Sequence, residues 1–242
     1  MPRSALFSTA LYGILLTACA TPAATNPFGG PPHGRPASGL AGALPLLTGS
    51  RVPVYLPSKL PSPPAGAFYA IQARARDGGY DVSVSFSNQQ APVNGSAVSS
   101  QAGFVGEVVG GPAQSVGAGV RQLIRFTGSP QTVTLPTGIR AKFYPDQGIE
   151  WTQGGWRYEV SNGFAKPATP GALLSEVKQI QDALLPAGNP IGAGTTGEVV
   201  EPIGADTPDV YILWTHGEDA YQIDGSGTSS IRLAKDLVEV QP

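Results

Sequence analysis

Few side chains in this sequence could serve as nucleophiles, bases or metal ligands. The 242 residues include one cysteine, Cys19, and two histidines, His33 and His216. A Ser-His-Asp triad would need one of these histidines, and the Gly-x-Ser-x-Gly turn of many hydrolases is missing. Zinc is usually held by several Cys or His ligands, and the sequence has no cluster of Cys or His. We therefore predict no metal and no cofactor, and we do not expect an enzyme.

Acidic side chains offer one catalytic alternative. Glycoside hydrolases use two carboxyl groups that flank the bond they cleave. Glu107, Asp146, Glu150 and Glu159 are candidates for such a pair, although each also fits a solvated strand face or a turn. The stretch His216-Gly217-Glu218-Asp219 is a weaker candidate for holding a cation, and an exposed hairpin turn explains it better.

Cys19 closes an N-terminal segment that is typical of a secretory leader. Arg3 gives a positive start, and residues 5–18 are apolar but too few to span a bilayer of about 30 Å. The segment ends in Leu16-Thr17-Ala18-Cys19, which resembles the lipobox of bacterial lipoproteins. The resemblance implies that residues 1–18 are removed and that fatty acids on Cys19 hold the protein in a membrane. It also implies a place in the cell envelope, outside the cytoplasm.

The residues after Cys19 bear on sorting and spacing. Ala20 resembles the outer-membrane sorting signal of diderm bacteria, whereas in a monoderm the protein would face outward from the cytoplasmic membrane. Residues 19–50 are rich in Pro, Gly, Ala and Thr, which predicts a flexible tether with a solvated His33. The folded part is then expected to begin at Arg51, where closely spaced prolines favour an extended or edge segment.

Composition excludes some classes of protein. There are 15 basic and 17 acidic residues, so no basic surface is available for nucleic acid. Hydrophobic residues make up 41% of the chain, which is enough for a core. The 32 glycines and 24 prolines indicate long loops or tails around that core.

An internal repeat predicts the main elements. Residues 149–160 (IEWTQGGWRYEV) and 212–223 (ILWTHGEDAYQI) align without gaps and share Ile, Trp, Thr, Gly and Tyr. Residues 71–82 match more weakly. In each segment apolar and polar residues alternate around a Gly-containing turn, which predicts a β-hairpin.

Two helices and two further strands complete the expected elements. Thr169-Pro170 is a cap and first-turn pair, and the apolar residues that follow recur at helical spacing. They are Leu173, Val177, Ile180 and Leu184. A second helix is predicted after Thr228, with Ile231, Ala234, Leu237 and Val238 on one stripe. Strands are predicted at residues 131–135 and 139–144, and no helix is predicted in the Gly-rich residues 87–120.

The predicted fold class is α+β. An antiparallel sheet is built from repeated β-hairpins, and each of the last two hairpins is followed by a short helix packed on the sheet. Residues 51–186 would form a first globular region, and residues 187–242 a second hairpin-helix repeat in the same or a separate domain. The order of Trp, turn, aromatic-x-Tyr and short helix, from Trp151 to Val238, resembles an uncharacterised domain. That domain occurs in lipoproteins and in anti-sigma-factor ectodomains, mostly of Gram-positive bacteria. The resemblance implies no established activity.

Five aromatic residues fall at matching hairpin positions: Trp151, Trp156, Tyr158, Trp214 and Tyr221. They either pack the helices against the sheet or line a ligand-binding groove, and packing is the favoured interpretation. Trp156 is the exception, because its counterpart is Asp219. We therefore expect Trp156 at the rim of the sheet, where it would be dispensable for stability and available to a ligand.

The sequence as a whole predicts a lipid-anchored, outward-facing bacterial lipoprotein with a non-catalytic binding or sensory domain. Its partner would be an unidentified protein, peptide, glycan or lipid, with nucleic acid excluded by the charge balance. One alternative is a carrier of lipid or another apolar ligand. An apolar cavity between the sheet and the helices would favour this alternative. The other is a cell-wall hydrolase, which requires a cleft with two facing carboxylates.

Overall fold

The computed structural model describes residues 31–95, 103–116, 126–161, 170–184, 191, 197–202, 209–227 and 229–242. Cys19 and the predicted leader lie outside these ranges. In chain order the elements are η1 (Ser38–Leu46, a 3₁₀-helix), β1 (Val54–Pro57), β2 (Phe68–Arg76), β3 (Gly79–Ser87), β4 (Gly103–Pro112), β5 (Gln131–Thr134), β6 (Arg140–Tyr144), β7 (Gly148–Gln153), β8 (Trp156–Ser161), α2 (Pro170–Leu184), β9 (Gly197–Pro202), β10 (Asp209–His216), β11 (Asp219–Ser226), α3 (Ser229–Lys235) and β12 (Leu237–Val240).

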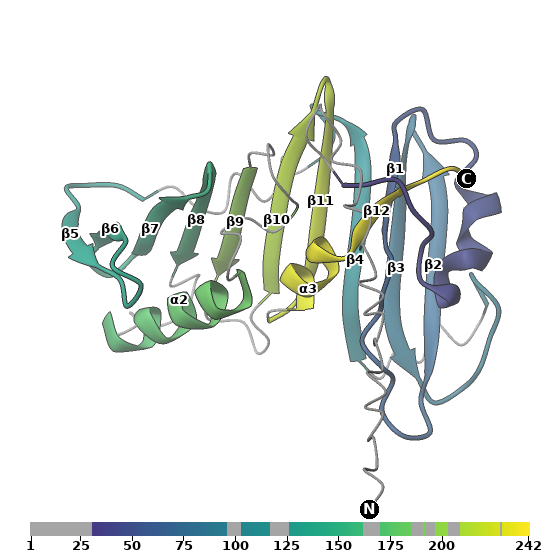
Figure 1. The fold of residues 1–242 in the computed structure, drawn as a ribbon, viewed down its shortest axis with the longest axis horizontal. Coiled ribbons are helices and arrows are strands. Elements are labelled where there is room, and N and C mark those ends of the chain that lie inside the picture. Colours follow the sequence, from purple (N-terminus) through teal and green to yellow (C-terminus); the bar gives the residue numbers. More distant parts are fainter. Residues whose placement is uncertain are drawn as a thin grey trace, which may run out of the picture.

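A ten-stranded sheet forms the body of the molecule (Figure 1). Its strand order is β2-β3-β4-β11-β10-β9-β8-β7-β6-β5, and only the β8–β9 pair is parallel. Strands β9, β10 and β11 come from the end of the chain but lie between β4 and β8. The predicted regions 51–186 and 187–242 therefore share one sheet. With helices packed on a mainly antiparallel sheet, the α+β class is confirmed.

All three repeat segments form the predicted hairpins. In β7–β8, Trp151 lies opposite Tyr158, and in β10–β11, Trp214 lies opposite Tyr221, so these two copies share one register. The weaker copy, β2–β3, is also a hairpin, but its register differs because Ile71 lies opposite Val84 and not Val82. The β7–β8 turn is Gly154-Gly155, with φ angles of 59° and 82°, which a two-residue hairpin turn requires and glycine adopts without strain.

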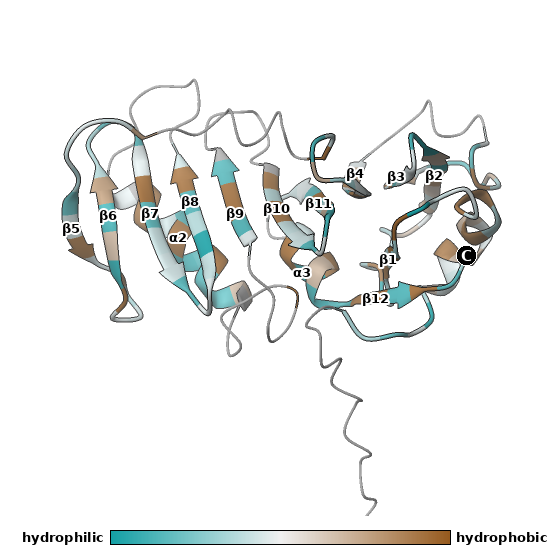
Figure 2. Cartoon of the chain, turned by 90° about the horizontal axis from the view of Figure 1, so that it is seen from above, coloured by the Kyte–Doolittle hydropathy of each residue, from teal (hydrophilic) through white to brown (hydrophobic). Residues whose placement is uncertain are grey.

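In the part of the chain that the structure describes, the covering elements lie on one side of the sheet. Helices α2 and α3 and the separate β1–β12 pair lie on the same side, as Figures 1 and 2 both show. We call this side the covered face and the opposite side the polar face. Helix α2 directs Leu173, Val177 and Ile180 into the core, as its spacing predicted. No helix within the described ranges is long and apolar enough to cross a membrane.

The second predicted helix is shorter than expected. Helix α3 ends at Lys235, and Leu237 and Val238 belong instead to β12. Val238 lies opposite Leu56 of β1, so these apolar residues are buried through strand pairing with the proline-rich segment. Helical spacing alone could not anticipate this pairing, because its partner lies far away in sequence.

The predicted tether is wrong for its second half. Residues 38–46 form η1, and Leu40, Ala43 and Leu47 are completely buried. Before η1, the Gly34 amide donates to the Glu239 carbonyl at 3.0 Å, which fixes the chain against β12. Three apolar residues spaced by three and four positions provide a buried stripe that the high Gly and Pro content concealed. Packed structure is therefore present well before Arg51, although the side chain of His33 is exposed as predicted.

Strand β4 lies within the glycine-rich stretch for which no element was predicted. One of its glycines, Gly110, faces large rings on both neighbouring strands. A Cβ atom at Gly110 would lie 2.4 Å from Tyr80 and 2.9 Å from Tyr221. Glycine is thus required here by close packing, and its high frequency in this segment does not indicate a loop.

Candidate functional site

The five aromatic residues predicted as a possible binding surface all lie in the core of the covered face. Their exposed fractions do not exceed 3%. Two of the pairs stack across their hairpins, with ring centroids 4.9 Å apart for Trp151–Tyr158 and 5.1 Å apart for Trp214–Tyr221. This burial favours the packing interpretation, because no ligand can reach these rings without displacing a covering element.

The expected rim position of Trp156 is wrong. Its side chain is fully buried, at 0% exposure, and it lies against β9. Gly197 of β9 makes room for the indole, since a Cβ atom there would lie 2.7 Å from Cζ3 of Trp156. The prediction failed because β9 was not anticipated, so the neighbour that buries Trp156 was missing. Trp156 is a core residue.

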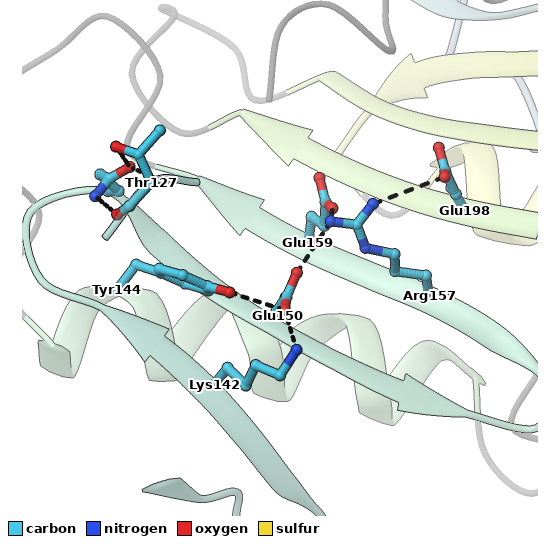
Figure 3. A network of polar contacts seen from close by, with 8 residues as sticks. Thr127, Lys142, Tyr144, Glu150, Arg157, Glu159 and Glu198 are labelled. Carbon is cyan, nitrogen blue, oxygen red and sulfur yellow. Dashed lines mark hydrogen bonds and ion pairs between the residues drawn. The ribbon is translucent and has the colours of Figure 1, made fainter. Parts of the chain in front are cut away.

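The polar face carries a network of charged residues on β6 to β9 (Figure 3). Glu150 and Glu159 lie directly opposite each other on β7 and β8. Lys142 Nζ lies 2.8 Å from one Glu150 oxygen, and Arg157 Nη2 lies 3.0 Å from the other. Arg157 also pairs with Glu159 and, at 3.8 Å, with Glu198 of β9. We call these five residues the carboxylate network.

The two facing carboxyl groups have opposite pKa shifts. Burial raises the pKa of Glu159 to about 7, against the attraction of Arg157. Burial would also raise the pKa of Glu150, but hydrogen bonds from Lys142, Arg157 and Tyr144 outweigh it and lower that pKa. Tyr144 donates to the same Glu150 oxygen as Lys142, at 3.1 Å.

A raised and a lowered carboxyl pKa side by side is what an acid and nucleophile pair needs. The geometry nevertheless favours an ion-pair network. Both Glu150 oxygens are engaged, one Arg157 nitrogen lies between the two carboxylates, and Glu159 is only 3% exposed. A sugar ring has no room between groups that share a guanidinium. The arrangement ties four strands together on a face that no described helix covers.

The other sequence candidates lie apart from this network. Glu107 is on β4, where burial and then Asp81 raise its pKa, and Asp146 lies exposed in the β6–β7 turn with a φ of 61°. His216 is half-buried at the end of β10, and its Nδ1 lies 2.9 Å from the Tyr55 hydroxyl. It therefore contacts β1, which the interpretation as an exposed turn residue did not foresee. Within the described ranges no group of three or more metal-ligating side chains occurs.

A second candidate site is an apolar groove of about 680 Å³ at the opposite end of the sheet. It lies between η1, the outer edge of β2 and the loop of residues 90–93, and we call it the β2 groove. Leu46 and Phe68 line it with exposed fractions of 42% and 39%. Its lining residues are Gly39, Gly42, Pro45, Leu46, Pro63, Ala67, Phe68, Tyr69, Ile71, Gln90, Ala91, Pro92 and Val93. Sequence reasoning missed it because η1 was assigned to the tether.

Comparison with known proteins gives no relative. No protein family, no curated protein and no solved structure matches this chain. The resemblance to lipoproteins and to anti-sigma-factor ectodomains thus stays a prediction from the residues. The features that bear on function are the predicted leader, the carboxylate network and the β2 groove.

Proposed function

We propose that this protein is a lipid-anchored, outward-facing bacterial lipoprotein whose folded part is a non-catalytic binding domain. The observation that carries the proposal is Cys19, the one cysteine of the chain, placed directly after Leu16-Thr17-Ala18. The thiolate of a cysteine is a strong nucleophile, which suits it to accept a fatty acyl group. Two or more acyl chains hold a protein stably on a membrane, whereas one does so only marginally.

The carboxylate network supports the non-catalytic half of the proposal. A hydrolase needs an acid and a nucleophile that touch the substrate, and Arg157 occupies the space between Glu150 and Glu159. The β2 groove supports a binding role, since it is open and apolar. The same groove is the observation that favours the second candidate, a carrier of an apolar ligand.

Lipidation is tested by growing cells that express the full chain with labelled palmitate. The wild-type protein should take up label and remain with the membrane fraction, and Cys19→Ser should lose both. Thr17→Ser is the matched control, because it keeps a small polar residue in the lipobox and should retain the label. Equal labelling of wild type and Cys19→Ser would refute the proposal, as would an intact Met1 on the membrane-bound protein by mass spectrometry.

A further inference from the structure

We propose that the β2 groove binds an extended, uncharged peptide segment of a partner protein, which adds a strand to the edge of β2. The inference rests on the proposed binding function and names the class of partner. It depends on the backbone of β2, on the lining of the groove and on the poor fit of other occupants.

Strand β2 ends the ten-stranded sheet, so one side of its backbone faces away from β3. Asn94 identifies the groups on that side. The Ala73 amide donates to Asn94 Oδ1 at 2.8 Å, and Asn94 Nδ2 donates to the Ala73 carbonyl at 2.9 Å. Outward-facing groups alternate with a period of two in an antiparallel strand, so Tyr69 and Ile71 present theirs on the same edge.

Asn94 already pairs with β2 as a single strand residue would. Besides its contacts with Ala73, its own amide donates to the Ile71 carbonyl at 2.8 Å. Among the described residues, the Ile71 amide and both backbone groups of Tyr69 have no such backbone partner on this edge. These groups form a short ladder site that continues the line begun by Asn94, and it opens onto the β2 groove.

The groove lining sets the chemistry of the peptide. Side chains of a strand point alternately to its two faces, so every second residue of a bound peptide would contact the groove. Leu46 and Phe68 offer exposed apolar surface for these contacts. Among the described residues, no Asp, Glu, Lys or Arg lines the groove, so a charged side chain would lose its hydration without gaining a partner there. The peptide should therefore have uncharged, mostly apolar residues at alternate positions.

A second copy of the chain cannot readily fill this edge with β5, the other end strand of its sheet, which has only four residues. Pro130 and Pro136 flank the β5 segment closely, and proline cannot donate to a ladder. A membrane surface is disfavoured as well, because interfacial binding is helped by basic residues and the groove has none. A peptide of a different protein is the occupant that the charge and backbone groups favour.

The test uses the full chain, held by its own lipid in nanodiscs, as bait for a displayed library of random linear peptides. Enriched peptides are synthesised, and their dissociation constants are measured by fluorescence anisotropy. Leu46→Glu and Phe68→Glu should each weaken binding by about tenfold or more, because a carboxylate would be buried against an apolar peptide. Phe104→Glu is the matched control, since Phe104 is equally exposed at 42% but does not line the groove, and its binding should be unchanged.

A second measurement needs no protein variant and separates strand addition from general apolar binding. N-methylation of alternate peptide residues should weaken binding about tenfold in one of the two alternating sets and leave the other unaffected. Bound peptide should also slow hydrogen exchange at the Tyr69 and Ile71 amides.

Three results would overturn the inference. They are no enrichment over nanodiscs that lack the chain, equal effects of both N-methylated sets, or unchanged binding by both Glu variants at the groove. Dimerisation or vesicle binding that Leu46→Glu abolishes without any peptide would also reject it, in favour of a second copy or a membrane. Acylation of Cys19 is measured separately. Absence of an acyl group on Cys19 refutes the lipoprotein proposal, whereas lack of peptide binding by an acylated protein refutes only this inference.

Discussion

The two matching hairpins, β7–β8 and β10–β11, are alike on one face and different on the other. On the covered face both have a Trp opposite a Tyr, stacked at similar centroid distances of 4.9 Å and 5.1 Å. On the polar face the first hairpin has Glu150, Arg157 and Glu159, where the second has Leu213, Ala220 and Gln222. The repeat is thus a repeat of core packing, and the exposed sides of the two copies differ in chemistry.

The covers of the two hairpins differ as well. Helix α2, with 15 residues, packs over the first hairpin, whereas α3 has 7 residues and the chain then turns into β12. Tyr55 of β1 thereby reaches the second hairpin and meets Tyr221 edge-on, with centroids 4.8 Å apart. One type of aromatic platform is therefore covered by a long helix in one copy and by a short helix and a strand pair in the other.

The largest expected difference in stability is between variants at Trp156 and Asp219, which occupy equivalent positions in the two hairpins but differ in residue type. Trp156→Ala should lower the free energy of unfolding by about 3–5 kcal/mol, because a fully buried indole would leave a cavity beside Gly197. Asp219→Ala is the matched control and should cost less than about 1 kcal/mol, since this carboxyl is only half-buried next to a turn. Urea melts measure both. Similar losses for the two variants would show that the positions are equivalent after all.

Local patterns predicted much of the fold. The hairpins and α2 follow from period-two and helical spacing within a short stretch of sequence, and all were located correctly. The predicted end of α3 was wrong because Leu237 and Val238 pair with β1, a strand that lies far away in the sequence. Trp156 was misplaced for the same reason, since β9 buries it. A local pattern of apolar residues predicts whether a segment favours helix or strand. It does not predict which distant segment will pack against it.

The candidate sites were only partly predictable. Glu150 and Glu159 were two of the four acidic residues named as candidates for a carboxylate pair, and the hairpin register does bring these two together. The sequence could not show that Arg157 lies between them. The β2 groove was not anticipated, because residues 38–46 were predicted to belong to a flexible tether and no element was predicted at residues 90–93. Cys19 depends on local sequence alone and remains a prediction.

The second-largest expected effect is on the pH dependence of stability, and it follows from the residues that each covering helix packs against. Helix α3 buries Ile231 and Ala234, whereas α2 places Glu176 against Glu201 of β9. Burial, and then the nearby Glu176, raises the pKa of Glu201 to about 8 from an ordinary value of 4.5. Between these two pH values the unfolded chain loses the proton while the folded protein keeps it. Stability should therefore fall as pH rises from about 4.5 to about 8.

Glu201→Gln removes that titrating group and keeps a neutral side chain of similar size. The variant should lose a large part of the pH dependence and be more stable than wild type at pH 8 by about 2–4 kcal/mol. Thermal melts across this pH range measure it. Glu218→Gln, in the exposed β10–β11 turn, should leave the profile unchanged. Parallel profiles for wild type and Glu201→Gln would contradict the assignment and place the pH sensitivity elsewhere.

The third effect tests the difference between the polar faces. Arg157→Ala, which copies the residue of the second hairpin, should cost about 1–2 kcal/mol at neutral pH, because two carboxylates lose their shared partner. The loss should be modest because the Arg157 side chain is 48% exposed, so water screens its ion pairs. Adding Glu150→Leu and Glu159→Gln, to copy the second hairpin fully, should restore most of the loss, as apolar replacement of an ion network often does. A triple variant less stable than Arg157→Ala would show that the network itself holds the strands together.

The smallest effect belongs to His216, whose counterpart in the first hairpin is Gln153. The Tyr55 hydroxyl lies 2.9 Å from His216 Nδ1, and Tyr55 is otherwise fully buried. His216→Gln should cost about 0.5 kcal/mol or less, because an amide can still bond the hydroxyl. His216→Leu should cost about 1 kcal/mol more, since the hydroxyl would then have no partner in a buried place. Urea melts of the two variants at pH 7.5 give the difference directly. If Gln and Leu are equally tolerated, the Tyr55–His216 contact does not fix β1 on the second hairpin, and the packing of the Tyr55 ring against Trp214 and Tyr221 holds it there without that hydrogen bond.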